Sequence, residues 1–290
     1  MGVGSRTALL FTFMFGLFLV IGWAVGGFFF SNWVVGALMF LVLAAIFNLI
    51  SYFYASKIVL WSYKAKIVDE SQAPRLFRRV RHIAQMSDMP MPKVAIVPTD
   101  TPNAFATGRN PDNAVVAATQ GLLKLLDDDE LDAVLAHEMA HVKDRDILVM
   151  SIAATLAGAI SFAARSVFWG MLFGGGRKDS GALIIAVIIA VTAPIAAILI
   201  QLAISRSREY KADEVGAMII GRPMNLVKAL RKLEKGNKRK PIEYGNPASS
   251  SLWIVNPFKA GGFSKLFATH PPMEERIKRL KRMAGTMGEH

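Results

Sequence analysis

Cysteine is absent from this chain of 290 residues. Disulfide bonds and thiolate metal ligands are therefore excluded, so any metal ion must be held by histidine and carboxylate side chains. Acidic residues are few, because 34 lysines and arginines face 22 aspartates and glutamates, which gives a net charge of +12. Zinc-finger spacing and an aromatic RNA-binding motif are also missing, which argues against nucleic acid as a partner. Attraction to the anionic headgroups of a lipid bilayer explains the basic charge more simply.

Charged residues are missing from two long stretches near the N-terminus, residues 7–30 and 33–56. Each is long enough to cross the hydrocarbon core of a membrane as a helix. A cleaved signal peptide is the alternative for the first stretch, since Arg6 precedes an apolar run. That run is longer than a typical signal sequence and a second one follows at once, which favours an uncleaved anchor.

Two further apolar stretches, residues 147–172 and 182–204, are joined by a short polar loop. Arg165 lies inside the earlier stretch, and a charge at that depth usually faces protein, a water-filled cavity or the membrane interface. The sequence therefore predicts up to four transmembrane helices and leaves open whether the third and fourth cross completely.

Basic residues beside these stretches predict the orientation of the chain. The loop between the third and fourth stretches holds only Arg177 and Lys178, whereas more basic residues follow the second and the fourth stretch. The positive-inside rule then places the polar segments and both termini in the cytoplasm, in a multi-pass protein of the cell inner (plasma) membrane. The basic residues on the cytoplasmic side include Lys57, Lys64, Lys66, Arg206, Arg208 and Lys211.

We expect a mainly helical α+β protein with four parts. Residues 1–61 form two transmembrane helices, and residues 147–204 form a membrane hairpin. Residues 62–146 and 205–290 form the two parts of one cytoplasmic catalytic domain with a small β-sheet. The hairpin would return the chain to the side of the membrane that it left.

The first cytoplasmic part has the pattern of a small α+β unit. Residues 72–87 are predicted to form a basic amphipathic helix, and residues 93–97 a short strand. Two more strands are expected at residues 103–107 and 113–119, joined by a turn.

One edge of the predicted sheet is a candidate substrate site. A peptide can pair with an open strand edge, which holds a backbone without reading much of its sequence. A covered strand is an equally good alternative. The residues expected to bind substrate in this way are Asn103, Ala104 and Phe105.

A His-Glu-x-x-His motif is the most informative feature of the chain. His137 and His141 lie one turn apart on the same face of a helix, so both imidazoles can reach one metal ion. Glu138 points away from them and can handle a proton. Asp127 and Glu130 form the pattern of a capping box, which predicts a stable N-terminus for this helix.

A catalytic zinc ion usually takes three protein ligands and keeps one position for water. Glu209, just after the fourth apolar stretch, is the best candidate for the third ligand. Asp213 follows one turn later and could accept a hydrogen bond from the far nitrogen of a ligand histidine. The alternative is that Glu209 and Asp213 are ordinary charged residues at the end of a membrane helix, where they pair with Arg208 or Lys211.

Taken together, these motifs resemble the HtpX group of bacterial and archaeal membrane metalloproteases. The wider clan includes the CAAX prenyl proteases and the Oma-type peptidases. The resemblance covers nearly the whole chain and includes the Asn103–Gly108 strand and a box at Thr269–Pro272. It implies a zincin-like domain with one Zn²⁺ per chain, and cleavage of misfolded or damaged membrane proteins. It also implies that His137, His141 and Glu209 bind zinc, that Glu138 is the catalytic base, and that Asp213 supports the ligands.

The oxyanion formed during peptide hydrolysis needs a donor opposite the metal, and His270 is a candidate. Arg276 is a second candidate, although it could simply pair with Glu274 or Glu275. Residues 241–269 are rich in glycine, proline and serine, and we interpret them as a flap over the metal.

Two other functions remain as alternatives at this point. A non-catalytic membrane scaffold would hold a structural zinc ion with four closed ligands. A transporter would explain Arg165 and Pro194, but inverted repeats are missing. The sequence does not predict the oligomeric state.

Overall fold

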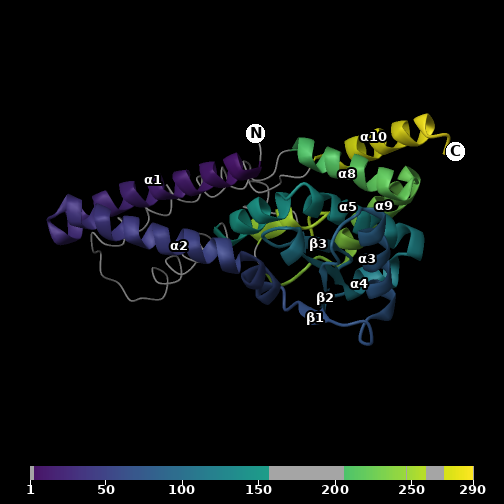
Figure 1. The fold of residues 1–290 in the computed structure, drawn as a ribbon, viewed down its shortest axis with the longest axis horizontal. Coiled ribbons are helices and arrows are strands. Elements are labelled where there is room, and N and C mark those ends of the chain that lie inside the picture. The colour runs from purple at the N-terminus through teal and green to yellow at the C-terminus, as the bar shows by residue number, and fades with distance from the viewer. Residues whose placement is uncertain (1–2, 157–205, 246, 259–270, 290) are drawn as a thin grey trace.

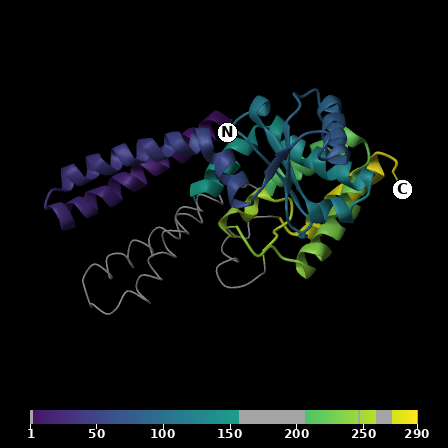
Figure 2. The same ribbon diagram turned by 90° about the horizontal axis from the view of Figure 1, so that it is seen from below.

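The computed structural model describes residues 3–156, 206–245, 247–258 and 271–289. Two long helices, α1 (Val3–Phe30) and α2 (Trp33–Ser62), lie side by side and project from a mixed domain that holds the other elements (Figures 1 and 2). Asn32 caps α2, since its side chain accepts a hydrogen bond of 3.1 Å from the Val35 amide. The two helices approach closely at Gly26 and Gly36, where a Cβ on Gly26 would lie 2.6 Å from the Gly36 Cα.

The α2 helix is long and apolar enough to cross a membrane. Many of its apolar side chains are exposed, including Val34 at 67%, Val42 at 61% and Leu49 at 62%, as lipid-facing residues would be. It is the one helix of this length and composition among the described residues, which also contain shorter apolar helical stretches at Thr7–Trp23 and Asp146–Leu156. The rest of the third stretch, Arg165 and all of the fourth lie outside the described residues.

The sheet has four strands in the order β1-β2-β4-β3. Strands β2 and β4 are parallel, and the other two pairs are antiparallel. The predicted strand at 93–97 is confirmed as β2. The other two predicted strands begin one and two residues later than expected, the latter because Pro111–Asn113 form a 3-10 turn. The strands are β1 (Lys66–Val68), β2 (Lys93–Val97), β3 (Ala104–Thr107) and β4 (Val115–Thr119).

Both faces of the sheet are covered by apolar side chains. Successive side chains of a strand point to opposite faces, so Val116 and Ala118 join the main core while Val115 and Ala117 join a second cluster. The main core lies between the sheet and the helices, with α5 packed against α3, α8, α9 and β3. The helices of this domain are α3 (Pro74–Met86), α4 (Gln120–Leu125), α5 (Asp128–Lys143), α8 (Arg206–Ile220), α9 (Pro223–Arg239) and α10 (Met273–Thr286).

An aromatic cluster joins the end of α2 to the other face of the sheet. The rings of Tyr63 and Phe105 each pack edge-on against Trp253, with centroids 4.8 and 4.7 Å from it. The Tyr63 hydroxyl shares a short hydrogen bond with Ser249 in the 3-10 helix η2 (Pro247–Leu252). Within the segment predicted as a flap, residues 249–255 are buried in the domain, and their role in covering the metal stays a prediction. Residues 259–270 lie outside the described residues.

Replacing Trp253 with alanine is expected to destabilise the domain by about 3–5 kcal/mol, because a fully buried indole leaves a large cavity. The side chain is 1% exposed and contacts both Tyr63 and Phe105. Chemical denaturation in detergent would measure the loss. Replacing the exposed Trp61 with alanine is the matched control, since that side chain is 82% exposed. Equal stability of the two variants would contradict the packing role of Trp253.

Candidate metal centre

The helix that carries the motif begins at a well-formed cap. The Asp127 side chain accepts a hydrogen bond of 2.9 Å from the Glu130 amide, and the Glu130 carboxylate accepts one of 3.2 Å from the Asp127 amide. The predicted capping box is thus confirmed. Every residue from Glu130 to Val142 is buried, so α5 is the central helix of the domain.

Three side chains converge on one buried point between α5 and α8. His137 and His141 lie one turn apart on α5, and their ring centroids are 4.9 Å apart. The Nε2 atoms of the two rings lie 3.9 and 3.5 Å from the carboxylate oxygens of Glu209 on α8. A ligand atom from each of the three lies within 4.8 Å of the others. The structure therefore brings together the three residues predicted as metal ligands.

The donor set and spacing fit a metal ion. Ligand atoms bound 2.0–2.2 Å from a tetrahedral zinc ion lie about 3.4 Å from one another, close to the separations found here. The Nε2 atom of His137 is buried and has no hydrogen-bond partner among the described residues. Two imidazole nitrogens and one carboxylate oxygen are a ligand set that leaves a position open.

Asp213 lies behind His137, one turn after Glu209. Its Oδ1 atom is 3.0 Å from the Nδ1 atom of His137, a distance at which it can accept the ring proton and leave Nε2 for a metal. Burial alone would raise the pKa of Asp213, but the charge and hydrogen bonds of Arg276, with a smaller contribution from His137, hold it below its usual range. The carboxylate is therefore ionised.

Arg276 holds this carboxylate. Its alternative pairing with Glu274 or Glu275 is not found among the described residues, and its role as an oxyanion donor stays a prediction. Its guanidinium donates hydrogen bonds of 2.8 and 2.7 Å to the two oxygens of Asp213 and a third of 2.8 Å to the Ile254 carbonyl. The arginine is 1% exposed. Among the described residues, the alternative pairing of Glu209 and Asp213 with Arg208 or Lys211 is not found either. Arg208 and Lys211 instead contact Asp146 and Asp144.

Glu138 is buried beside the two histidines, on the side of strand β3. The backbone of Ala106, on that strand, acts to lower the pKa of the Glu138 carboxylate. Burial raises the pKa of Glu138 to about 7, against the opposing charge of His141. The small side chains of Ala104 and Ala106 face the same core as α5, which lets the strand approach the helix.

The two histidines differ in basicity. Burial lowers the pKa of His137, and this effect outweighs its contact with Asp213. Burial also disfavours the charged form of His141, but Asp146, Glu209 and Glu138 together outweigh it and raise the pKa to about 9. Because a metal ion binds the neutral imidazole, the affinity of this site for a metal should fall as the pH is lowered.

The residues predicted to bind substrate make contacts within the domain. Asn103 donates a hydrogen bond of 2.6 Å to the Val255 carbonyl, and the Ile254 amide donates one of 3.2 Å to the Ala104 carbonyl. Phe105 packs in the aromatic cluster. All three are fully buried. The Ala104 carbonyl is thus already paired with Ile254, and substrate binding at these three residues stays a prediction. His270 lies outside the described residues.

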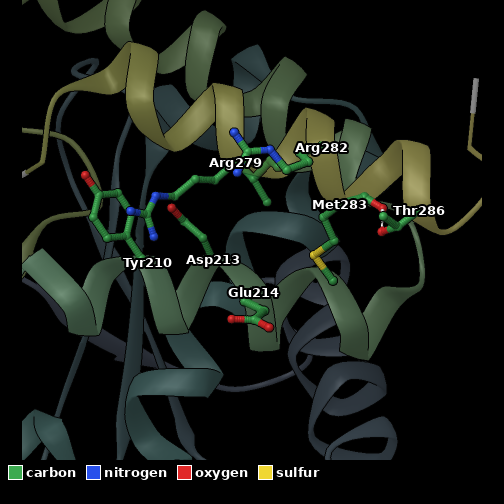
Figure 3. A pocket seen from close by; sticks show the side chains of 8 residues that line it. Tyr210, Asp213, Glu214, Arg279, Arg282, Met283 and Thr286 are labelled. Carbon is green, nitrogen blue, oxygen red and sulfur yellow. Dashed lines mark hydrogen bonds between the residues drawn. The ribbon is translucent and has the colours of Figure 1, made fainter.

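A separate pocket of about 300 Å³ opens between α8 and α10 (Figure 3). The Arg279 guanidinium lies 3.7 Å from the centre of the Tyr210 ring at one end of it. Asp213 contributes to the lining, but the motif histidines and Glu138 do not. This pocket is therefore distinct from the place where the three candidate ligands meet.

Gly216 sets the distance between α8 and α5. A Cβ at this position would lie 2.8 Å from the backbone nitrogen of His137. Replacing Gly216 with alanine is expected to cost about 1–3 kcal/mol through overpacking and to lower the metal content of the purified protein. Replacing Gly285 with alanine is the control, because nothing lies within 4 Å of a Cβ there. Metal analysis and thermal unfolding would check both; unchanged values for Gly216→Ala would contradict the close contact.

Comparison with known proteins agrees with this centre. A profile of "Peptidase family M48" matches residues 70–284. The chain is 49% identical to a "Protease HtpX homolog" of Thermococcus sibiricus, over 99% of this chain and 98% of that protein. It is also 49% identical to the protein of that name from Pyrococcus furiosus, over 99% of both chains.

Among solved structures, the crystal structure of S. mikatae Ste24p aligns with a TM-score of 0.48 at 17% identity. The alignment covers 91% of this chain, which spans 62% of that protein. The match to the family over most of the chain and the full-length relatives carry the assignment: the chain belongs to peptidase family M48, among the HtpX homologs, and is a metalloprotease.

Proposed function

We propose that the protein is a zinc-dependent endopeptidase of the cell inner (plasma) membrane that cleaves misfolded or damaged membrane proteins on the cytoplasmic side. The observation that carries the proposal is the convergence of His137, His141 and Glu209 on one buried point beside Glu138. Zinc is the metal that best suits two imidazoles and one carboxylate in the absence of cysteine. A non-catalytic scaffold would require a fourth protein ligand, and the described residues offer three.

A zinc ion bound here would supply Lewis acidity and make water a nucleophile at neutral pH. Glu138 takes the proton of the attacking water and passes it to the leaving amine. Burial acts to raise the pKa of Glu138 above its ordinary value, the direction that suits a general base, which works best when its pKa is near the operating pH.

The membrane location is supported by the exposed apolar faces of the α1–α2 pair. The proposed substrates are exposed loops and unfolded tails of other membrane proteins, held by their backbone close to β3. Strand β3 packs against α5, the helix that carries Glu138. Recognition of backbone rather than side chains would suit the removal of damaged proteins.

The activity test uses the full-length protein purified in detergent. Zinc-loaded protein should cleave an unfolded, dye-labelled protein at internal bonds, and a chelator should stop the cleavage. Magnesium should not restore the activity, because Mg²⁺ prefers oxygen ligands. Cleavage that persists in the stripped protein would overturn the proposal.

The topology test uses the absence of cysteine. Single cysteines introduced at Gln120, Arg177 and Lys240 can each be labelled with a reagent that does not cross the membrane. Positions 120 and 240 should react only when the reagent has access to the cytoplasmic face of the membrane. Position 177 should react from the opposite face if the third and fourth segments cross fully. Labelling of 120 and 240 from opposite sides would contradict a metal centre built from both parts of the domain.

A further inference from the structure

A second buried carboxylate, Asp146, lies next to the metal centre. It follows the end of α5 by three residues and is 3% exposed. Its Oδ1 atom lies 3.2 Å from the Arg208 guanidinium, and its Oδ2 atom lies 3.9 Å from the Nδ1 atom of His141. Arg208 is 7% exposed and directly precedes Glu209 in α8. This contact links a residue that follows α5 to one near the start of α8.

The surroundings of the two histidines are alike. Each histidine presents Nε2 to Glu209 and Nδ1 to an aspartate, and each aspartate is paired with a buried arginine. An acceptor at Nδ1 keeps the proton on that nitrogen and leaves the lone pair of Nε2 for a metal. The distance of 3.9 Å is longer than a hydrogen bond, but a small rotation of the Asp146 side chain would close it.

Stability alone is a weak reason for this buried ion pair. Removing two charges from water costs about as much as their attraction returns, and apolar residues often serve as well. The neighbouring pair of Asp144 and Lys211 already joins the same two segments at 2.7 Å, with side chains that are 30% and 58% exposed. The buried pair of Asp146 and Arg208 is therefore not needed to hold these two segments together, which indicates another role for it.

We propose that Asp146 and Arg208 are positioning residues of the metal centre. Asp146 orients His141, and Arg208 holds Asp146 while lying beside the ligand Glu209. The two segments of the domain that carry Asp146 and Arg208 are thereby fixed to the ligand geometry. This inference rests on the proposed function, because it assumes that His141 and Glu209 bind the metal.

The test compares the two ion pairs by metal affinity, measured by competition with a chelator on the full-length protein. Asp146→Ala should weaken zinc binding about 10–100-fold, as loss of a residue that orients a ligand does. Asp144→Ala removes the matched tether and should change the affinity less than about threefold. Thermal unfolding of the metal-free proteins gives a readout that is independent of the metal and of activity.

Two conservative variants keep the test decisive if Asp146→Ala fails to fold. Asp146→Asn retains an acceptor oxygen and should bind zinc more tightly than Asp146→Ala, and Arg208→Lys should lie between the wild type and Arg208→Ala. Equal zinc affinities for the Asp146 and Asp144 variants would overturn the inference, as would an effect confined to unfolding of the metal-free protein. Failure of the proposed function would look different, because the wild type itself would then bind no zinc or cleave no protein.

Discussion

Replacing Glu138 with glutamine is expected to lower the rate of peptide hydrolysis by about 10²–10⁴-fold, the usual contribution of a general base. Glutamine has nearly the same shape but cannot accept the proton of the attacking water. The side chain is buried, and an amide of nearly the same size fits the same space. The fold and the three candidate ligands should therefore be unchanged.

Metal content provides the control for this variant. Zinc per chain should equal that of the wild type, since Glu138 is not one of the three converging ligands. An active Glu138→Gln protein would contradict the assigned role of this residue. An inactive protein without metal would show instead that the substitution disturbs the centre, and the assignment of the base would then need another variant, such as Glu138→Asp.

Replacing Glu209 with glutamine is expected to abolish both zinc binding and activity. A neutral amide is a poor ligand for zinc, and Glu209 is the group that faces both Nε2 atoms. The loss of affinity should exceed the roughly 10–100-fold effect of a residue that only supports a ligand. Competition with a chelator would measure the loss of zinc affinity, and cleavage of an unfolded substrate would measure the loss of activity.

Glu214 offers a matched control for this substitution. It lies on the same helix but is exposed and lines the separate pocket between α8 and α10. Glu214→Gln should therefore keep its metal and its activity. Wild-type zinc affinity in the Glu209 variant, or equal losses in both variants, would show that the third ligand comes from another residue.

The features that sequence predicted best depend on short spacings. The motif helix and its capping box involve residues three or four positions apart, so helix geometry alone brings them together. Glu209 and Asp213 are likewise one turn apart, and their place beside α5 was inferred from the chemistry of a third ligand and from the family resemblance. Strand β1 was not predicted, because three residues are too few to show an alternating pattern.

The features that sequence did not predict depend on contacts between distant residues. Arg276 has acidic neighbours in its own helix, but it lies on the buried face of α10 and reaches Asp213, 63 positions earlier. Trp253 lies in a stretch without periodicity, and its burial depends on Tyr63 and Phe105. Asp146 resembles an ordinary charge at a membrane boundary until Arg208 is placed next to it.

The central claim is that one zinc ion, held by residues from both parts of the catalytic domain, is responsible for proteolysis. The most direct measurement is to strip the purified protein with a chelator, add zinc in known steps, and follow cleavage of an unfolded substrate at each step. Activity should be absent at the start, rise in proportion to bound zinc, and level off at one ion per chain, while Glu209→Gln protein should gain none. Activity that survives stripping, or that zinc restores to the Glu209 variant, would contradict the account.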